Sequence, residues 1–343
     1  MGGTGAELAE QVLTAARTNS RTAPSGPSPF AVDAAPLARG KFTDPLKTAD
    51  GSPRAQVRLE RLDTLWLNTG TLCNLACANC YIDSSPTNDA LVYLTAAEVT
   101  RFLDEIADSG RPVREIGFTG GEPFMNPAVM AMLEDALGRG HEALVLTNAM
   151  TPMRRHEAAL LALRERFGSR FTLRVSVDHY TAKVHEAERG PGSWAPMLGG
   201  LTWLANHGFA LAVAGRHLAS EDEADARAGY AALFAAHGVN VDAGDPAQLV
   251  LFPEMDEAAD VPEITEECWG ILDKSPSQVM CSNSRMILHR KGESAARVVA
   301  CTLLPYEPEF DLGATLDEAS GEVSLNHPHC ARFCVLGGAS CSA

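Results

Sequence analysis

Three cysteines near residue 75 have the spacing Cys73-x3-Cys77-x2-Cys80. Thiolates bind iron–sulfur clusters and structural zinc, so a short loop that supplies three of them indicates a metal site. A cubane cluster normally takes four cysteines, one on each iron, and three cysteines therefore leave one iron open. An open iron can bind an amino acid through its amino and carboxylate groups. Structural zinc would need a fourth ligand close by, and no further cysteine or histidine stands near this loop in the sequence.

Six further cysteines lie between Cys268 and Cys341, and the chain has none between Cys80 and Cys268. Cysteines grouped in this way in a cytosolic chain indicate metal binding or catalysis rather than a disulfide framework. The candidate ligands of a second metal site are Cys281, Cys301, Cys330, Cys334 and Cys341. Cys268 stands beside Trp269 and is equally compatible with an apolar core thiol.

Zinc is a rival to iron and sulfur at this second site, because four thiolates also suit tetrahedral zinc. His327 and His329 are available as ligands there, and we favour a supporting or structural role for both.

Alternation of strands and helices begins near residue 60. The expected strands cover 61–68, 114–118, 143–147, 171–177 and 209–214, and the expected helices cover 127–137, 154–167, 194–206 and 221–237. One more helix begins at a capping box, Thr95-Ala-Ala-Glu98, and continues with an apolar stripe. Strands separated by such helices predict right-handed βαβ units and a parallel sheet. About six units fit between residues 60 and 250, which favours an α/β fold of the partial (β/α)6 TIM-barrel type over a full barrel of about 250 residues.

Polar and small residues follow several of the expected strands. They are Gly120, Gly121, Glu122, Thr147, Asn148 and Asp178. In parallel α/β folds, ligands bind at the carboxyl ends of the strands, so these residues and the first cysteine loop are expected to share one site.

At these residues the sequence resembles the radical S-adenosylmethionine family. Cys73-x3-Cys77-x2-Cys80-Tyr81 is similar to the family's cluster motif, in which an aromatic residue commonly precedes or follows the last cysteine. Gly120-Gly121-Glu122-Pro123 resembles its glycine-rich motif, whose backbone and acid bind the methionine amino group. Ser176-Val-Asp178 and the later Arg189-Gly190 resemble a strand and an Arg-Gly element of the family. The resemblance covers about residues 60–240.

The resemblance implies two cofactors, a 4Fe-4S cluster with an open iron and S-adenosylmethionine. It implies that Ser176 and Asp178 face the cofactor, and that Thr147 and Asn148 lie near its ribose.

The C-terminal part resembles the SPASM extension, or its shortened twitch form, which binds auxiliary iron–sulfur clusters. The resemblance rests on Cys281-Ser-Asn-Ser-Arg285, Cys301 and Cys330-x3-Cys334-x6-Cys341. The family's close pair has two residues between its cysteines, and here there are three. Six thiols cannot complete two four-ligand clusters, so we expect one auxiliary cluster, or a second with an open iron. Apolar runs at 284–289 and 296–301 flank a Lys291-Gly292 turn and predict a hairpin that brings Cys281 and Cys301 together.

These patterns divide the chain into three expected parts. Residues 1–40, rich in Ala, Ser, Pro and Gly, would form a flexible leader; residues 41–255 the barrel; and residues 256–343 a small cysteine-rich domain.

The formal charge is −16, from 44 acidic and 28 basic residues. A surface this negative repels phosphate backbones, so we expect no nucleic acid as partner. No apolar run approaches the roughly 20 residues needed to cross a bilayer, and the first residues lack a secretory signal, so a soluble cytoplasmic protein is expected.

The resemblance implies an oxidoreductase-type enzyme that cleaves S-adenosylmethionine reductively to methionine and a 5′-deoxyadenosyl radical, which abstracts hydrogen from a substrate. Net oxidation or rearrangement would follow, with a reductant such as flavodoxin or ferredoxin as partner. Catalytic residues are unknown; Arg216, Tyr306 and Asp178 are plausible from position alone.

The substrate class is open. Residues 1–60 are too short and weakly patterned for a winged-helix recognition domain, which favours a small molecule. The alternative is a peptide- or protein-modifying enzyme, either a RiPP maturase or of the sulfatase-maturase type. An alternative of another class is a non-catalytic iron–sulfur electron carrier, which would not cleave S-adenosylmethionine.

Overall fold

The structure is a computed structural model that describes residues 23–24 and 26–338. Its centre is a nine-stranded sheet with the strand order β10-β9-β8-β2-β3-β4-β5-β6-β7. The strands are β2 (Thr64–Asn68), β3 (Glu115–Thr119), β4 (Glu142–Thr147), β5 (Phe171–Ser176), β6 (Ala210–Gly215), β7 (Leu249–Leu251), β8 (Ser284–Leu288), β9 (Arg297–Val299) and β10 (Asp311–Gly313). Strands β8 and β2 to β7 run parallel, while β9 and β10 are antiparallel additions. The expected partial barrel is confirmed.

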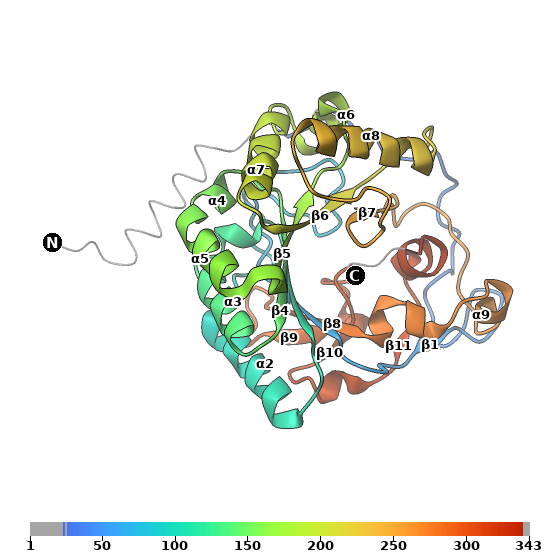
Figure 1. Ribbon diagram of the computed structural model, residues 1–343. Coiled ribbons are helices and arrows are strands. Elements are labelled where there is room, and N and C mark those ends of the chain that lie inside the picture. The colour runs from blue at the N-terminus through green and yellow to red at the C-terminus, as the bar shows by residue number, and fades with distance from the viewer. Residues whose placement is uncertain (1–22, 25, 339–343) are drawn as a thin grey trace.

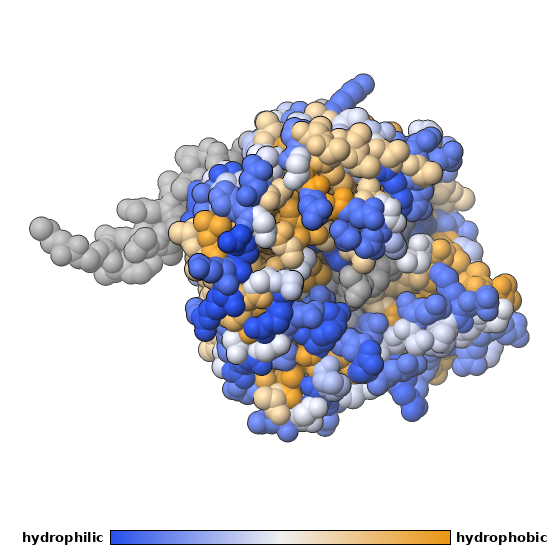
Figure 2. Space-filling model, in the orientation of Figure 1, coloured by the Kyte–Doolittle hydropathy of each residue, from blue (hydrophilic) through white to orange (hydrophobic). Residues whose placement is uncertain are grey.

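Helices cover the convex side of this curved sheet (Figure 1). They are α2 (Ala96–Ser109), α3 (Val129–Gly138), α4 (Thr151–Arg154), α5 (Glu157–Phe167), α6 (Ala182–Arg189), α7 (Trp194–Asn206) and α8 (Glu223–Ala236), with the short α9 (Cys268–Ile271) in the C-terminal part. Figure 2 shows hydrophilic residues interspersed with apolar ones on one face of the molecule. No helix among the described residues is long and apolar enough to span a bilayer.

The first predicted helix starts where its capping box requires. The backbone N–H of Glu98 donates to Thr95 Oγ1 at 3.2 Å, and the N–H of Thr95 donates back to Glu98 Oε2 at 2.8 Å. This reciprocal pair satisfies two of the amides that an α-helix leaves open at its start. The apolar stripe of α2 is buried at Val99, Phe102, Leu103 and Ile106.

Strand β2 is buried on both faces, as expected for a central strand of a parallel sheet. Leu65 and Leu67 point into the core beneath the helices, whereas Trp66 points into a second core formed with the C-terminal part. Trp66 pairs across the sheet with Gly117 of β3, and a Cβ at Gly117 would lie 2.4 Å from the indole ring. The glycine therefore makes room for the largest side chain of the second core.

The C-terminal hairpin joins the barrel sheet. Strands β8 and β9 pair antiparallel around the Lys291-Gly292 turn, as predicted, and β8 also pairs parallel with β2. The part expected as a second domain thus shares its sheet with the barrel. It ends in a π-helix, η7 (Cys330–Leu336).

The N-terminal segment packs along the C-terminal half. Strand β1 (Gln56–Val57) pairs antiparallel with β11 (Val323–Ser324), and the N–H of Leu37 donates to Ala258 O at 2.7 Å. Of the leader predicted over 1–40, residues 1–22 and 25 lie outside the described residues. The remainder includes Phe30, which is only 2% exposed. The sequence composition does not reveal this anchoring, because it comes from one aromatic side chain and from backbone hydrogen bonds to a distant segment.

Candidate active site

The carboxyl ends of β2 to β6 surround a cavity of about 180 Å³. Its lining includes most of the residues that the sequence placed at the strand ends: Cys73, Cys77, Cys80, Gly120, Gly121, Thr147, Asn148, Ser176 and Asp178. These side chains come from loops far apart in the sequence and meet because neighbouring parallel strands end at one edge.

Backbone amides support the sulfurs of the cysteine loop. The N–H of Leu75 donates to Cys73 Sγ, and the N–H of Ser84 donates to Cys80 Sγ, both at 3.4 Å. Burial raises the pKa of all three thiols, that of Cys77 to about 12. Buried thiols of this kind become thiolates when a cation coordinates them, so the donor set fits a metal cluster.

The two glycines allow the loop after β3 to touch the cysteine loop. A Cβ on Gly121 would lie 2.4 Å from Leu72 O, and one on Gly120 would lie 2.6 Å from Gly70 O. The N–H of Gly121 donates to Gly70 O at 2.8 Å. Close packing of the two backbones is therefore one reason for glycine here.

Glu122 lies behind the cavity wall and is 1% exposed. Its carboxylate accepts hydrogen bonds from the N–H of Asn148 at 2.8 Å, the hydroxyl of Thr147 at 2.9 Å and the N–H of Phe124 at 3.2 Å. Burial raises the pKa of Glu122 to about 7, although these hydrogen bonds act in the opposite direction. The carboxylate thus joins the ends of β3 and β4.

Asp178 forms a buried ion pair with Arg189, whose Nε lies 2.5 Å from Asp178 Oδ2. Burial alone would raise the pKa of Asp178, but the guanidinium of Arg189 outweighs it, and the pKa is lowered. Asp178 therefore contributes a negative charge to the cavity wall, and because it stays deprotonated near neutrality it is a poor general acid. Both residues line the cavity, as does Ser176 at the end of β5.

The other two candidates for acid–base chemistry differ in position. Arg216 lines the cavity and pairs with two glutamates, Glu188 and Glu254. Tyr306 is not among the cavity-lining residues; its hydroxyl donates to Ile82 O at 2.8 Å, and burial raises its pKa to about 12. A phenol with that pKa is a poor proton donor near neutrality.

Cys281, Cys301, Cys330 and Cys334 line a second, small cavity together with His329. Cys281 precedes β8 and Cys301 follows β9, so the hairpin brings them to one end. Burial raises the pKa of Cys281 to about 11, and raises the pKa values of Cys330 and Cys334, with nearby thiols adding to the effect. Cys341 lies outside the described residues.

The three-residue spacing between Cys330 and Cys334 has a structural reason. Both lie on η7, where residues four apart lie about one helical turn apart and on the same face. Cys268 does not line this cavity; the N–H of Thr265 donates to its sulfur at 3.4 Å.

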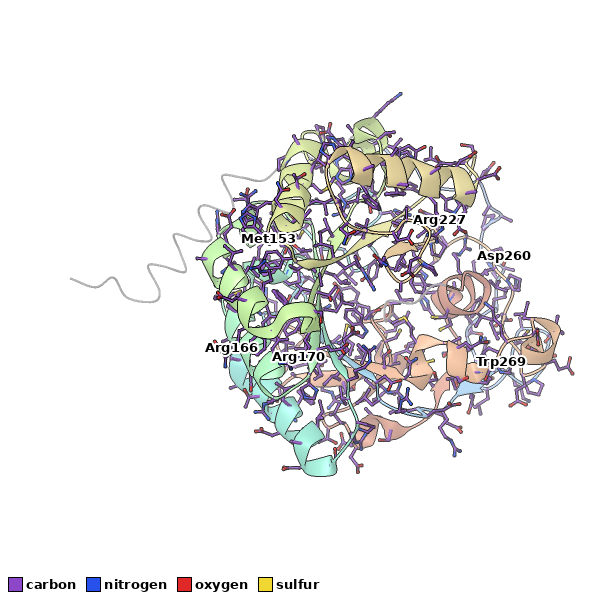
Figure 3. The ribbon with its side chains drawn as sticks, in the orientation of Figure 1. Met153, Arg166, Arg170, Arg227, Asp260 and Trp269 are labelled. Carbon is purple, nitrogen blue, oxygen red and sulfur yellow. The ribbon has the colours of Figure 1, made fainter. Side chains whose placement is uncertain are left out.

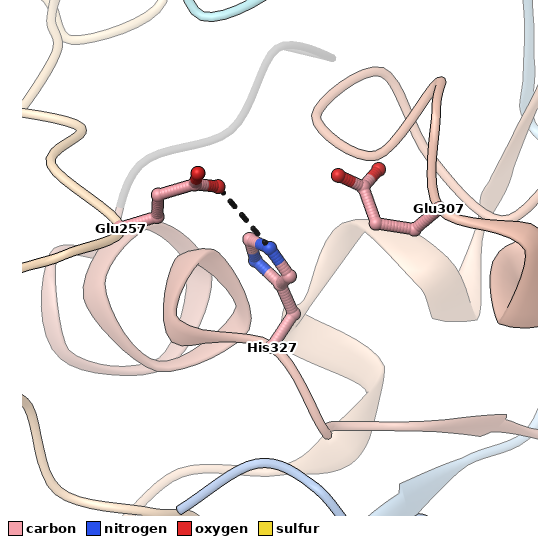
Figure 4. A group of neighbouring side chains, drawn as sticks. All are labelled: Glu257, Glu307 and His327. Carbon is pink, nitrogen blue, oxygen red and sulfur yellow. Dashed lines mark ion pairs between the residues drawn. The ribbon is translucent and has the colours of Figure 1, made fainter. Parts of the chain in front are cut away.

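His327 meets two carboxylates near the second cavity. Glu257, Glu307 and His327 place one ligand atom each within 4.8 Å of one another (Figure 4). The N–H of His329 donates to His327 Nδ1 at 3.1 Å, so in the neutral ring Nε2 carries the proton. That nitrogen lies 3.6 Å from Glu257 Oε2. This tautomer suits an interaction with the carboxylate rather than metal ligation.

Sequence reasoning missed several residues around the first cavity. Glu188 directly precedes the recognised Arg189-Gly190 element, and that position could have drawn attention to it. Asn79 stands at a position that the cysteine motif leaves open to any residue. Glu254 and the apolar wall residues belong to no motif; those wall residues are Phe252, Met255, Leu303 and Phe333.

The model of the radical SAM superfamily matches residues 67–225. Residues 67–225 therefore form a radical SAM domain. Its cofactors are a 4Fe-4S cluster and S-adenosylmethionine, and the thiols and strand ends described above fit both.

Two curated proteins match part of this chain. The antilisterial bacteriocin subtilosin biosynthesis protein AlbA of Bacillus subtilis is 33% identical over 143 residues, which is 41% of this chain and 30% of the relative. The AdoMet-dependent heme synthase of Methanosarcina barkeri is 29% identical over 140 residues, 40% of this chain and 37% of the relative. The matches therefore span only about a third of the relatives' lengths.

Two solved structures have a fold similar to that of this chain. Streptococcus suis SuiB bound to S-adenosylmethionine has a TM-score of 0.54 at 11% identity, over 74% of this chain and 64% of that one. The tagged protein anSMEcpe with bound AdoMet has a TM-score of 0.52 at 13% identity, over 75% of this chain and 79% of that one.

Proposed function

We propose that this enzyme reductively cleaves S-adenosylmethionine to methionine and a 5′-deoxyadenosyl radical, which abstracts hydrogen from a substrate at the barrel mouth. The observation that carries the proposal is the cavity shared by Cys73, Cys77 and Cys80 with the ends of β3, β4 and β5. The bound cofactors supply the electron and the radical, while the protein positions them and excludes water. A reductant such as flavodoxin or ferredoxin would deliver the electron.

The three cysteines are the proposed cluster ligands. Asn148, Ser176 and Asp178 line the cavity and would contact S-adenosylmethionine, with Thr147 beside them. Gly120 and Gly121 would hold the cysteine loop against the end of β3. Glu122 would act chiefly by fixing Thr147 and Asn148, since both of its oxygens already accept hydrogen bonds.

The second cavity is the proposed site of an auxiliary iron–sulfur cluster. Its four thiols are Cys281, Cys301, Cys330 and Cys334. Such a cluster could accept an electron from a substrate radical, which would make the overall reaction an oxidation. Zinc would suit four thiolates as well, and metal analysis of the purified protein separates the two.

We favour a peptide substrate. The relative with 33% identity is named for biosynthesis of a bacteriocin, and the cavity has an apolar wall that can receive a side chain. That wall consists of Phe252, Met255, Leu303 and Phe333. The second candidate is a small molecule, favoured by the similarity to a heme synthase.

The first experiment is anaerobic incubation of reduced, iron-reconstituted protein with S-adenosylmethionine, followed by mass spectrometry for 5′-deoxyadenosine. We expect this product from the wild type and none from a Cys73→Ala/Cys77→Ala/Cys80→Ala variant. Its absence from the wild type would support an electron carrier instead. Product from the triple variant would refute the proposed cluster ligands.

The substrate class needs its own experiment. A short peptide encoded beside this protein, incubated in the same reaction, should lose hydrogen or gain a cross-link detectable by tandem mass spectrometry. An unchanged peptide, together with modification of a tetrapyrrole precursor, would favour the small-molecule candidate.

A further inference from the structure

The short run between Cys77 and Cys80 is held from two sides. The N–H of Asn79 donates to Glu188 Oε1 at 3.0 Å, and its side-chain amide donates to Glu254 Oε1 at 2.5 Å. The N–H of Ala78 donates to Glu188 O at 2.8 Å. Glu188 lies near the end of α6, and Glu254 follows β7. Two elements far apart in the sequence therefore form hydrogen bonds to the loop between Cys77 and Cys80, two proposed cluster ligands.

Arg216 joins these two glutamates. Its Nη2 forms an ion pair with Glu254 Oε2, and its Nη1 lies 3.5 Å from Glu188 Oε1. Glu188 is 2% exposed and Arg216 is 8% exposed. One buried guanidinium thus neutralises two carboxylates. Without it, the two negative charges would repel each other beside the proposed cluster site. Buried charges without a partner are costly, so Arg216 makes this arrangement possible.

Arg216 is itself fixed from several directions. Its backbone N–H donates to Asp178 O at 3.0 Å and lies 3.1 Å from the Tyr230 hydroxyl. Phe30 of the N-terminal segment covers the guanidinium, with 4.3 Å between the guanidinium carbon and the ring centre. A cation over an aromatic face is stabilised, and the ring also shields the ion pairs from water.

We propose that Arg216, covered by Phe30, is a positioning residue that fixes the loop between Cys77 and Cys80 through Glu188 and Glu254. The inference rests on the proposed function in one respect, the assignment of Cys77 and Cys80 as cluster ligands. It also gives the N-terminal segment a role at the active site. This network of contacts reaches the second cysteine group, because Phe252, two residues before Glu254, packs at a tilt against Phe333 of η7 with ring centres 5.4 Å apart.

The first test uses hydrogen exchange on the metal-free protein, which needs neither cluster nor activity. In Arg216→Gln, the Glu188 carboxylate, which accepts from Asn79, loses its ion pair, and the end of α6, whose Glu188 carbonyl accepts from Ala78, loses a restraint. The amides of Ala78 and Asn79 should therefore exchange about tenfold faster. Arg166→Gln is the matched control. Arg166 forms an ion pair with Glu134 at the outer surface of α5, where both side chains are 60% exposed (Figure 3). Unchanged exchange at Ala78 and Asn79 in Arg216→Gln would overturn the proposal.

The second test measures the midpoint potential and the electron paramagnetic resonance spectrum of the reduced cluster. Removing the cation in Arg216→Gln should lower the potential, and removing a carboxylate in Glu254→Gln should raise it. The double variant should return toward the wild type, because the charge balance is restored. Potentials that move in the same direction in both single variants would contradict the proposal.

If Arg216→Gln does not fold, the Phe30→Leu variant tests the proposal instead. Leucine keeps most of the apolar cover but offers no aromatic face, so exchange at Ala78 and Asn79 should rise in the same direction by a smaller factor. Wild-type exchange in Phe30→Leu would remove Phe30 from the network and overturn the proposal as stated. If the wild type binds no cluster at all, the proposed function is wrong. The exchange experiments still test whether Arg216 fixes the loop through Glu188 and Glu254.

Discussion

Asp178 and Arg189 form an ion pair in the wall of the cavity, with Asp178 Oδ2 2.5 Å from Arg189 Nε, and both side chains are largely buried. Asp178 follows β5 and Arg189 ends α6, so the pair ties the helix to the strand end that it follows. The pair belongs to a charged wall that continues through Glu188 to Arg216.

Breaking this pair should be costly. Asp178→Asn leaves the Arg189 guanidinium buried without its counter-charge, and we expect a loss of about 3 kcal/mol in the free energy of unfolding. Cleavage of S-adenosylmethionine should fall with it, because both residues line the cavity. Urea denaturation of the metal-free protein measures the first effect, and 5′-deoxyadenosine formation measures the second.

The control for that prediction is an exposed pair of the same chemistry. Arg114 and Glu142 lie 2.5 Å apart, with side chains 49% and 42% exposed. Exposed pairs contribute about 0–1 kcal/mol, so Glu142→Gln should change little. Equal losses in Asp178→Asn and Glu142→Gln would show that burial does not decide the cost.

Glu122 should make stability depend on pH. Burial raises its pKa to about 7 in the folded protein, above the 4.5 of a free side chain. The folded state therefore binds the proton of Glu122 more tightly than the unfolded state does. The contribution of Glu122 to the free energy of unfolding is greatest below about pH 4.5 and is lost as the pH rises toward 7. The shift corresponds to about 3 kcal/mol.

Urea denaturation of the metal-free protein at several pH values from 4.5 to 8 measures this dependence. Glu122→Gln should lower stability at every pH, because its amide cannot accept from Asn148 and Phe124 together, and should flatten the curve. If stability depends on pH with the same slope in the wild type and in Glu122→Gln, groups other than Glu122 cause the dependence.

Sequence patterns predicted the barrel well because each strand and helix carries its own local signal. The capping box at Thr95 and the apolar stripe behind it define α2, and the Lys291-Gly292 turn defines the hairpin. The residues expected at the strand ends also share one cavity, since a parallel sheet brings such ends together. Strand β7 was missed because three residues are too few for a pattern.

The rest depends on contacts between distant segments. Nothing local marks Phe30 as a cover for Arg216, or Glu254 as an acceptor for Asn79, because partners more than 170 residues apart meet only in the folded chain. The pairing of β8 with β2 is of the same kind. Local patterns therefore predicted which strand ends line the cavity, and the tertiary structure supplied the residues that support them.

Gly121→Ala should disrupt the cysteine loop. The added Cβ would lie 2.4 Å from Leu72 O, so the loop that carries Cys73 must move. We expect iron incorporation at this site to fall severalfold. Gly199→Ala is the matched control, because Gly199 lies within α7 with nothing within 4 Å of an added Cβ. That change should stabilise the protein by up to about 1 kcal/mol. Normal iron content in Gly121→Ala would refute the steric argument.

The two cysteine groups should lose metal independently. Cys330→Ser removes a thiol from the second cavity, and we expect iron and sulfide content to fall while 5′-deoxyadenosine can still form. Cys268→Ser should keep the full content, because Cys268 does not line that cavity. Iron, zinc and sulfide analysis of both variants and the wild type measures this. A loss of zinc alone in Cys330→Ser would assign the second site to zinc, and an equal loss in Cys268→Ser would add that cysteine to the ligands.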